Sequence, residues 1–253
     1  MSAAEAAAIL RECRAALAAG GSTIVAEATG DGAIDDWRHY PDGEVYDRAS
    51  HAQYFFHRHA AGPRGRSVGA AEHGHFHLFL RGEGMPAGVT PLLLPELAVA
   101  NAPAAQPSAP LRLGASDKVC HLIALAVDAR GEPLRLFTTN RWVTGETWYR
   151  ADDVIGVLGR FRVHDSRPSA LLNRWLGAFV RLYEADIAAL LRQRDKAIVE
   201  RRWRSRGNVL EDQRLEITSS AAVDLDARLA EIERRPAPAS PRPLPRMAEG
   251  WGR

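Results

Sequence analysis

Apolar and polar positions alternate along residues 71–80 and again along residues 51–59. Successive side chains of a β-strand point to opposite faces of the sheet, so the alternation predicts two strands that each have an apolar face and a polar face. The polar positions are mostly histidine. If the two strands pair, one sheet face carries His51, His57, His59, His73, His75 and His77.

The remaining pattern predicts helices and further strands around these two. Helical spacing of apolar residues predicts an N-terminal helix over residues 3–19, a short helix near 152–161, a long helix over about 169–203 and a final helix over 223–234. Residues 22–36 fit either a strand or a helix. Residues 119–127 and 134–139 predict a hairpin, with a short edge strand near 215–218.

These elements predict an α+β fold, with an antiparallel sheet whose histidine-lined face carries the site. The long C-terminal helix and the N-terminal helix back its apolar face. We expect a single domain over residues 1–234. Within it, the turn at Pro41-Asp42-Gly43 precedes the histidine strands, and residues 82–110 form a long loop or lid. Residues 235–253 are rich in proline and are expected to be a disordered tail.

Composition and charge indicate the class of protein and its expected compartment. Hydrophobic residues make up 46% of the 253 residues and charged residues 25%, with a net charge of +2, which is ordinary for a globular protein. No apolar run reaches the roughly 20 residues that cross a bilayer, and the N-terminus has no basic signal-peptide start. We therefore expect a cytoplasmic protein that binds a small molecule, with no nucleic-acid or membrane partner and with a homodimer left open.

Histidine is concentrated in one part of the chain, since seven of the nine histidines lie between His39 and His77. Neutral imidazole is the commonest metal-ligand side chain, and Zn–N distances are about 2.0–2.1 Å. The cluster therefore predicts a divalent metal site, with iron or zinc as the ion. A metal-free catalytic site and a purely structural packing of rings are the alternatives.

Spacing limits which histidines can bind one ion. His73 and His77 lie about 13 Å apart along an extended strand and cannot share an ion. We predict His75 and His77 as direct ligands, with His57 or His59 from the neighbouring strand. His73 and His51 are expected at the margin of the same site or at a second ion.

Other polar residues complete the predicted site. Glu72 and Glu146 are the carboxylates expected beside the histidines, and with His75 they form the predicted catalytic group. A segment after the hairpin combines amide, guanidinium, hydroxyl and indole groups that could grip a small anionic substrate. Its predicted substrate-binding residues are Asn140, Arg141, Trp142, Thr144 and Trp148. The function expected is a metal-dependent hydrolase or oxidoreductase, and a non-catalytic metal-binding or interaction module is an alternative.

Two resemblances bear on these predictions. Residues 73–79, His-Gly-His-Phe-His-Leu-Phe, resemble the signature of the histidine-triad nucleotide hydrolases and transferases, although Gly74 replaces an apolar residue. That resemblance implies a metal-free enzyme in which His75 is the nucleophile, supported by His73 and His77.

A broader resemblance rests on residues 37–47, 51–59, 71–77 and 136–148, the last reading Leu-Phe-Thr-Thr-Asn-Arg-Trp-Val-Thr-Gly-Glu-Thr-Trp. Together these segments resemble an uncharacterised bacterial domain-of-unknown-function family over roughly residues 5–220. This resemblance implies no reaction and no site residues.

Overall fold

The computed structural model describes residues 1–30, 32–59, 72–92, 119–204 and 207–234. Its centre is a six-stranded antiparallel sheet in which every strand pairs with its neighbours in sequence, in the order β1 to β6. The strands are β1 Tyr40–Tyr46, β2 Ala52–His57, β3 Gly74–Arg81, β4 Val119–Val127, β5 Pro133–Thr139 and β6 Ile217–Ala222. This arrangement confirms the α+β class and the pairing of the two histidine strands.

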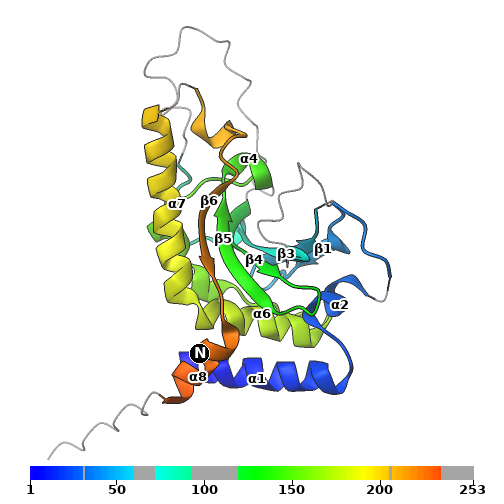
Figure 1. Cartoon of the computed structure of the whole chain (residues 1–253). Coiled ribbons are helices and arrows are strands. Elements are labelled where there is room, and N and C mark those ends of the chain that lie inside the picture. The colour runs from blue at the N-terminus through cyan, green and yellow to red at the C-terminus, as the bar shows by residue number, and fades with distance from the viewer. Residues whose placement is uncertain (31, 60–71, 93–118, 205–206, 235–253) are drawn as a thin grey trace, which may run out of the picture.

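The apolar face of the sheet forms the main core. Tyr54, Phe56, Phe76 and Leu78 of β2 and β3 are fully buried there. Helix α6 (Ala170–Leu182) covers this face, and helix α1 (Ala3–Ala19) lies against α6 on the far side from the sheet (Figure 1). The helices therefore occupy one side of β2 and β3, as the alternation predicted.

Local signals account for the helix starts. Ser2 begins α1 with a capping box, because its hydroxyl accepts from the backbone N–H of Glu5 while the Glu5 carboxylate accepts from the N–H of Ser2. The hydroxyl of Ser169 caps α6 by accepting from the backbone N–H of Leu172. Thr23 caps α2 (Ile24–Thr29), so the ambiguous residues 22–36 contain a short helix rather than a strand.

The predicted long helix over residues 169–203 is two helices. Helix α6 ends at Tyr183, whose φ of −102° and ψ of 17° leave the helical region, and α7 (Glu184–Arg204) starts at the next residue. Figure 1 shows α7 running along β6 in a different direction from α6. Continuous apolar spacing cannot reveal this break, because both helices bury apolar faces.

Register shifts interrupt four of the strand pairs, and two of these shifts affect the predictions. The turn expected at Pro41-Asp42-Gly43 lies inside β1 as a bulge, since the register with β2 shifts between Tyr40 and Val45. A second shift in β4 opposes Phe79 to His121 and Leu78 to Ile123, which leaves Leu122 as the additional residue. This bulge turns His121 onto the face that carries His77.

The remaining elements are short and lie after β3, after the hairpin and on either side of β6. They are η1 Gly82–Gly84, α4 Arg141–Thr144, α5 Ala151–Ile155, η3 Leu158–Arg160, η4 Val209–Glu211 and α8 Leu225–Arg234. Most of the lid expected over residues 82–110, and the tail from residue 235, fall outside the described residues. Within the described part, no helix has both the length and the apolarity to cross a bilayer.

Gly74 is the first residue of β3, and the Phe56 ring of the core packs closely against it. A Cβ added there would lie 2.5 Å from Cζ of Phe56 and 2.7 Å from the carbonyl oxygen of His57. We expect Gly74→Ala to lower the free energy of unfolding by about 1–3 kcal/mol, because a backbone oxygen and a packed ring must both move. Urea denaturation measures this change.

Gly159→Ala is the matched control, because nothing lies within 4 Å of a Cβ at Gly159 and its φ is not positive. Equal stabilities of the two variants would contradict the close packing of Phe56 over Gly74.

Candidate metal centre

Three histidines from the paired strands bring their ring nitrogens together. His57 is the last residue of β2 and lies opposite His75 of β3, while His59 follows two residues later, beyond the strand. One ligand nitrogen from each ring lies within 4.8 Å of the other two. Nε2 of His57 and Nε2 of His75 are only 2.7 Å apart. The group is the one metal-capable cluster of histidines, cysteines and carboxylates found in the described part of the chain.

The three rings are also oriented consistently. The plane of His57 is turned 87° from that of His75 and 80° from that of His59, and His59 is turned 75° from His75. Centroid separations are 4.5 to 5.0 Å. Edge-to-face contacts of this kind are also favoured between packed aromatic rings. The separations of the nitrogens, and not the ring angles, therefore identify the group as metal-capable.

A carboxylate lies behind one of these rings. Nδ1 of His75 is 3.2 Å from Oε1 of Glu72, and Nη2 of Arg135 donates to Oε2 of Glu72 over 2.9 Å. Burial alone would raise the pKa of Glu72, but the hydrogen bonds from His75 and Arg135 outweigh it, so the pKa is lowered. An ionised Glu72 accepts the Nδ1 proton of His75 and leaves its Nε2 lone pair facing His57.

Burial keeps the other two rings neutral. It lowers the pKa of His57 to about 2, with further lowering from the nearby His75, His59 and His39. It lowers the pKa of His59 to about 4, and the nearby His75 adds to that effect. Neutral imidazole is the form that binds a metal ion. Near pH 7 these two rings are therefore ready to act as ligands.

His77 is more deeply buried than these rings and pairs with His121. Its Nδ1 is 3.1 Å from Nε2 of His121, and both rings are buried. Burial lowers the pKa of both histidines, that of His121 to about 3. The sequence predicts His77 as a ligand beside His75, and the two ring centroids lie 4.9 Å apart; the nitrogens that lie within 4.8 Å of one another nevertheless belong to His57, His59 and His75. Residues directly across a strand pair approach more closely than residues i and i+2 of one strand, so His57 meets His75 instead.

His73 and His51 do not join the cluster. The ring of His73 precedes β3 and lies against Phe56, with centroids 6.5 Å apart. His51 has a φ of 62° in the turn before β2, and its Nδ1 is 2.8 Å from the hydroxyl of Tyr46. The parity argument placed both on the cluster's face. It fails for His51 because the left-handed backbone there breaks the alternation, and His73 lies before the first residue of β3.

Glu146 lies near the second histidine pair rather than near the three converging rings. Its Oε2 accepts from the backbone N–H of His121 over 3.1 Å, and its Oε1 accepts from the hydroxyl of Thr144. Burial raises the pKa of Glu146 to about 7, although Arg194 and these hydrogen bonds oppose the rise. Of the three predicted catalytic residues, the structure therefore brings His75 and Glu72 together and leaves Glu146 apart.

The predicted substrate-binding segment is engaged in packing contacts. Asn140 caps α4 and donates to the carbonyl of Val209, and Trp142 donates to the carbonyl of Leu215. The remaining members pair within the same region: Arg141 with Glu211, Thr144 with Glu146, and Trp148 with Arg194, whose guanidinium carbon lies 4.2 Å from an indole centroid. No described contact joins this segment to the three converging histidines, so its substrate role stays a prediction.

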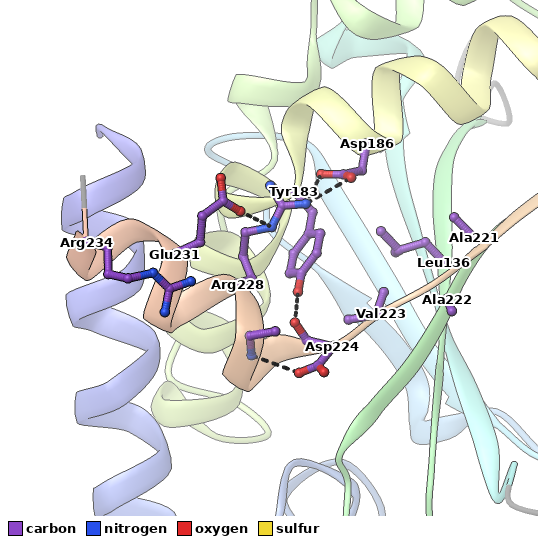
Figure 2. Close-up of a pocket in the computed structure, with 11 residues that line it drawn as sticks. Leu136, Tyr183, Asp186, Ala221, Ala222, Val223, Asp224, Arg228, Glu231 and Arg234 are labelled. Carbon is purple, nitrogen blue, oxygen red and sulfur yellow. Dashed lines mark hydrogen bonds and ion pairs between the residues drawn. The ribbon is translucent and has the colours of Figure 1, made fainter.

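A hollow of about 390 Å³ lies between β6, α7 and α8, and none of the described histidines lines it. Figure 2 shows Arg228 in it, bound to both carboxylate oxygens of Asp186 at 3.0 Å and paired with Glu231 at 3.9 Å. The hydroxyl of Tyr183 donates to the carbonyl of Asp224. These charges satisfy one another, and the residues contain no metal-capable group.

Sequence reasoning missed His121 as a member of the buried face. Its position in residues 119–127 is visible, but the bulge that turns it toward His77 is not. The sequence contains one signal for this bulge. Leu122 and Ile123 are two apolar residues in a row after His121, so apolar and polar positions do not alternate regularly there. An extra apolar residue in a strand is a signal for a bulge.

The fold and this site define an α+β protein whose antiparallel sheet carries a buried histidine cluster on one face. A family model described as Domain of unknown function (DUF6969) matches residues 4–223, and the chain belongs to this family. The match confirms the resemblance to an uncharacterised family. No curated protein and no solved structure matches the chain.

The raised pKa of Glu146 makes stability depend on pH. The folded protein holds this proton up to about pH 7, whereas the unfolded carboxyl releases it near its ordinary 4.5. The folded state therefore binds more protons between these values, and the carboxyl's contribution to stability falls as pH rises through that window. Glu146→Gln keeps an acceptor but cannot ionise. Between pH 5 and pH 8 we expect the free energy of unfolding of the variant to rise relative to that of the wild type by on the order of 3 kcal/mol.

Urea denaturation of both proteins in a chelator, at several pH values, measures the difference. The histidines titrate in both proteins and cancel from it. A difference that stays constant across the window would contradict an elevated pKa at Glu146.

Proposed function

We propose that this protein binds a divalent transition-metal ion, zinc or iron, through His57, His59 and His75, and uses it as a metal-dependent enzyme on a small substrate. The convergence of three imidazole nitrogens within 4.8 Å carries the proposal. His57 and His59 are half-buried and His75 is buried, so an ion held there would keep access to solvent on one side.

The separation of the two nearest nitrogens is compatible with a bound ion. Nε2 of His57 and Nε2 of His75 lie 2.7 Å apart, the distance of one N–H···N hydrogen bond between neutral imidazoles. Ligand nitrogens about 2.0–2.1 Å from a tetrahedral ion lie about 3.3 Å apart. A small outward movement from the 2.7 Å separation of the two Nε2 atoms would therefore admit an ion.

The surrounding residues fit a catalytic rather than a closed structural site. Three protein ligands with one open position are typical of catalytic zinc, whereas structural zinc takes four. The Glu72 carboxylate bonded to His75 is the arrangement that orients a metal-ligating imidazole and raises its basicity. When bound, the ion supplies Lewis acidity and an activated water. These features favour an enzyme over a non-catalytic binding module.

The histidine-triad alternative has less support from the geometry. It requires His73 and His77 to support His75, but the ring of His73 contacts Phe56 and Nδ1 of His77 faces His121. The contact between Glu72 and His75 would suit a histidine nucleophile as well as a ligand. Metal content separates the two alternatives.

We expect protein purified without a histidine tag to bind one equivalent of zinc or iron, and the His57→Ala and His75→Ala variants to lose it. Each substitution removes one of three ligands from a site in which the rings converge. Elemental analysis and Co²⁺ titration measure the stoichiometry.

His73→Ala is the matched control for the metal measurement. It removes a histidine from the same run of sequence, but one whose ring lies against Phe56. Full metal content in this variant, with loss in the other two, is the expected pattern. Wild-type protein that contains neither zinc nor iron as purified and takes up none of Zn²⁺, Fe²⁺ and Co²⁺ would refute the metal centre.

Glu72→Gln tests the carboxylate behind the ligand. We expect the variant to bind Zn²⁺ about 10–100-fold more weakly, because an amide orients and polarises His75 less well than a carboxylate. Competition against a chromophoric chelator measures the affinity. Glu211→Gln, which alters the partner of Arg141, is a control at an exposed acid away from the histidines. Equal affinities of Glu72→Gln and wild type would remove Glu72 from the site.

A further inference from the structure

Trp37 is an exposed indole placed directly on a proposed metal ligand. Its ring stacks on His59 with centroids 4.2 Å apart and planes 21° from parallel. The side chain is nevertheless 56% exposed, which makes it one of few large apolar residues left in solvent in the described part of the chain. Packing of the core does not explain this position, because most of the indole gains no burial from it.

The backbone of Trp37 is held in an unusual conformation. Its φ is 67°, in the left-handed region that bulky residues rarely adopt. Two contacts that involve Arg58, the residue after β2, hold it there. The N–H of Trp37 donates to the carbonyl of Arg58 over 2.8 Å, and the Arg58 guanidinium donates to Asp36 over 2.6 Å. Strained residues of this kind persist where neighbouring contacts enforce them, and they cluster at functional sites.

The charges around the three histidines are already paired. Arg58 is bound to Asp36 and Arg135 is bound to Glu72. The described residues beside the cluster therefore offer no spare guanidinium for an anionic substrate. They offer aromatic surface instead, since the ring of His39 stacks on Phe55 at 3.7 Å and contacts His57 at 5.4 Å. The rings of Trp37 and His39 therefore lie beside the three histidines.

From these contacts we propose that the site selects a planar aromatic ligand, whose donor atom binds the metal ion while its ring packs against Trp37. The inference rests on the proposed metal centre and names the substrate class of that same site. Stacking on an indole favours a flat ring over an aliphatic group of similar size, because aromatic pairs gain stabilisation beyond the burial of area. The strained backbone of Trp37 keeps the indole beside His59 before a ligand arrives.

Three hydroxamates that share one metal-binding group test the ring preference. Co²⁺-loaded protein is titrated with benzohydroxamate, cyclohexanecarbohydroxamate and acetohydroxamate, and the visible spectrum of the ion reports binding. We expect benzohydroxamate to bind about three- to tenfold more tightly than the cyclohexyl compound. Tryptophan emission should change with benzohydroxamate in the same titration.

Substitutions at Trp37 assign the preference to the indole. Trp37→Phe should keep a preference for the aromatic probe, and Trp37→Leu should abolish it while acetohydroxamate binds as before. Trp203→Ala is the control, because Trp203 is 85% exposed at the far end of α7. Equal binding of the benzoyl and cyclohexyl probes to the wild type, or an unchanged preference in Trp37→Leu, would overturn the inference.

The same experiment separates this inference from the proposed function. A wild-type protein that takes up no Co²⁺ would refute the metal centre and with it the ligand class. A protein that binds Co²⁺ and does not distinguish the three hydroxamates would keep the metal centre and refute the aromatic selection alone.

Discussion

The register between β2 and β3 is the constraint on which the candidate site depends. It sets His57 directly opposite His75, and it sets Phe56 opposite Phe76 on the other face. A slip of one residue would exchange the two faces of a strand. The register is held from the apolar side, because the Phe56 ring occupies the space that a side chain at Gly74 would fill. Packing of the core therefore determines the separation of two nitrogens on the opposite face.

Much of this arrangement follows from alternation in the sequence, and the limits have physical causes. A period of two correctly assigns the faces of β2 and β3, because their interiors keep regular strand dihedrals. It fails for His51 and His73 at strand ends, and for His121 beyond a bulge. Helical periodicity likewise locates α6 and α7 but not the break at Tyr183, where the backbone changes and the apolar pattern does not.

Which histidines converge could not be derived from the sequence for a different reason. Spacing along one strand favoured His75 with His77, but it contains no information about distances across the sheet. Those distances depend on the pairing register and on the strand twist. His59 presents the same difficulty in stronger form, since it lies outside the ladder and reaches the cluster from the chain beyond β2. The sequence shows that a histidine stands at this position, but only the tertiary structure shows that its ring reaches the cluster.

The buried histidines argue that this face was not shaped for stability alone. Burial holds the pKa of His57, His59 and His121 far below the ordinary 6.5, so each of these rings stays neutral at the expense of its preferred hydration. Apolar residues of similar volume would fill the same space without that cost. The left-handed backbone of Trp37 adds a further local cost beside His59. Costs concentrated around three converging nitrogens are expected where binding, rather than folding, determines which residues are present.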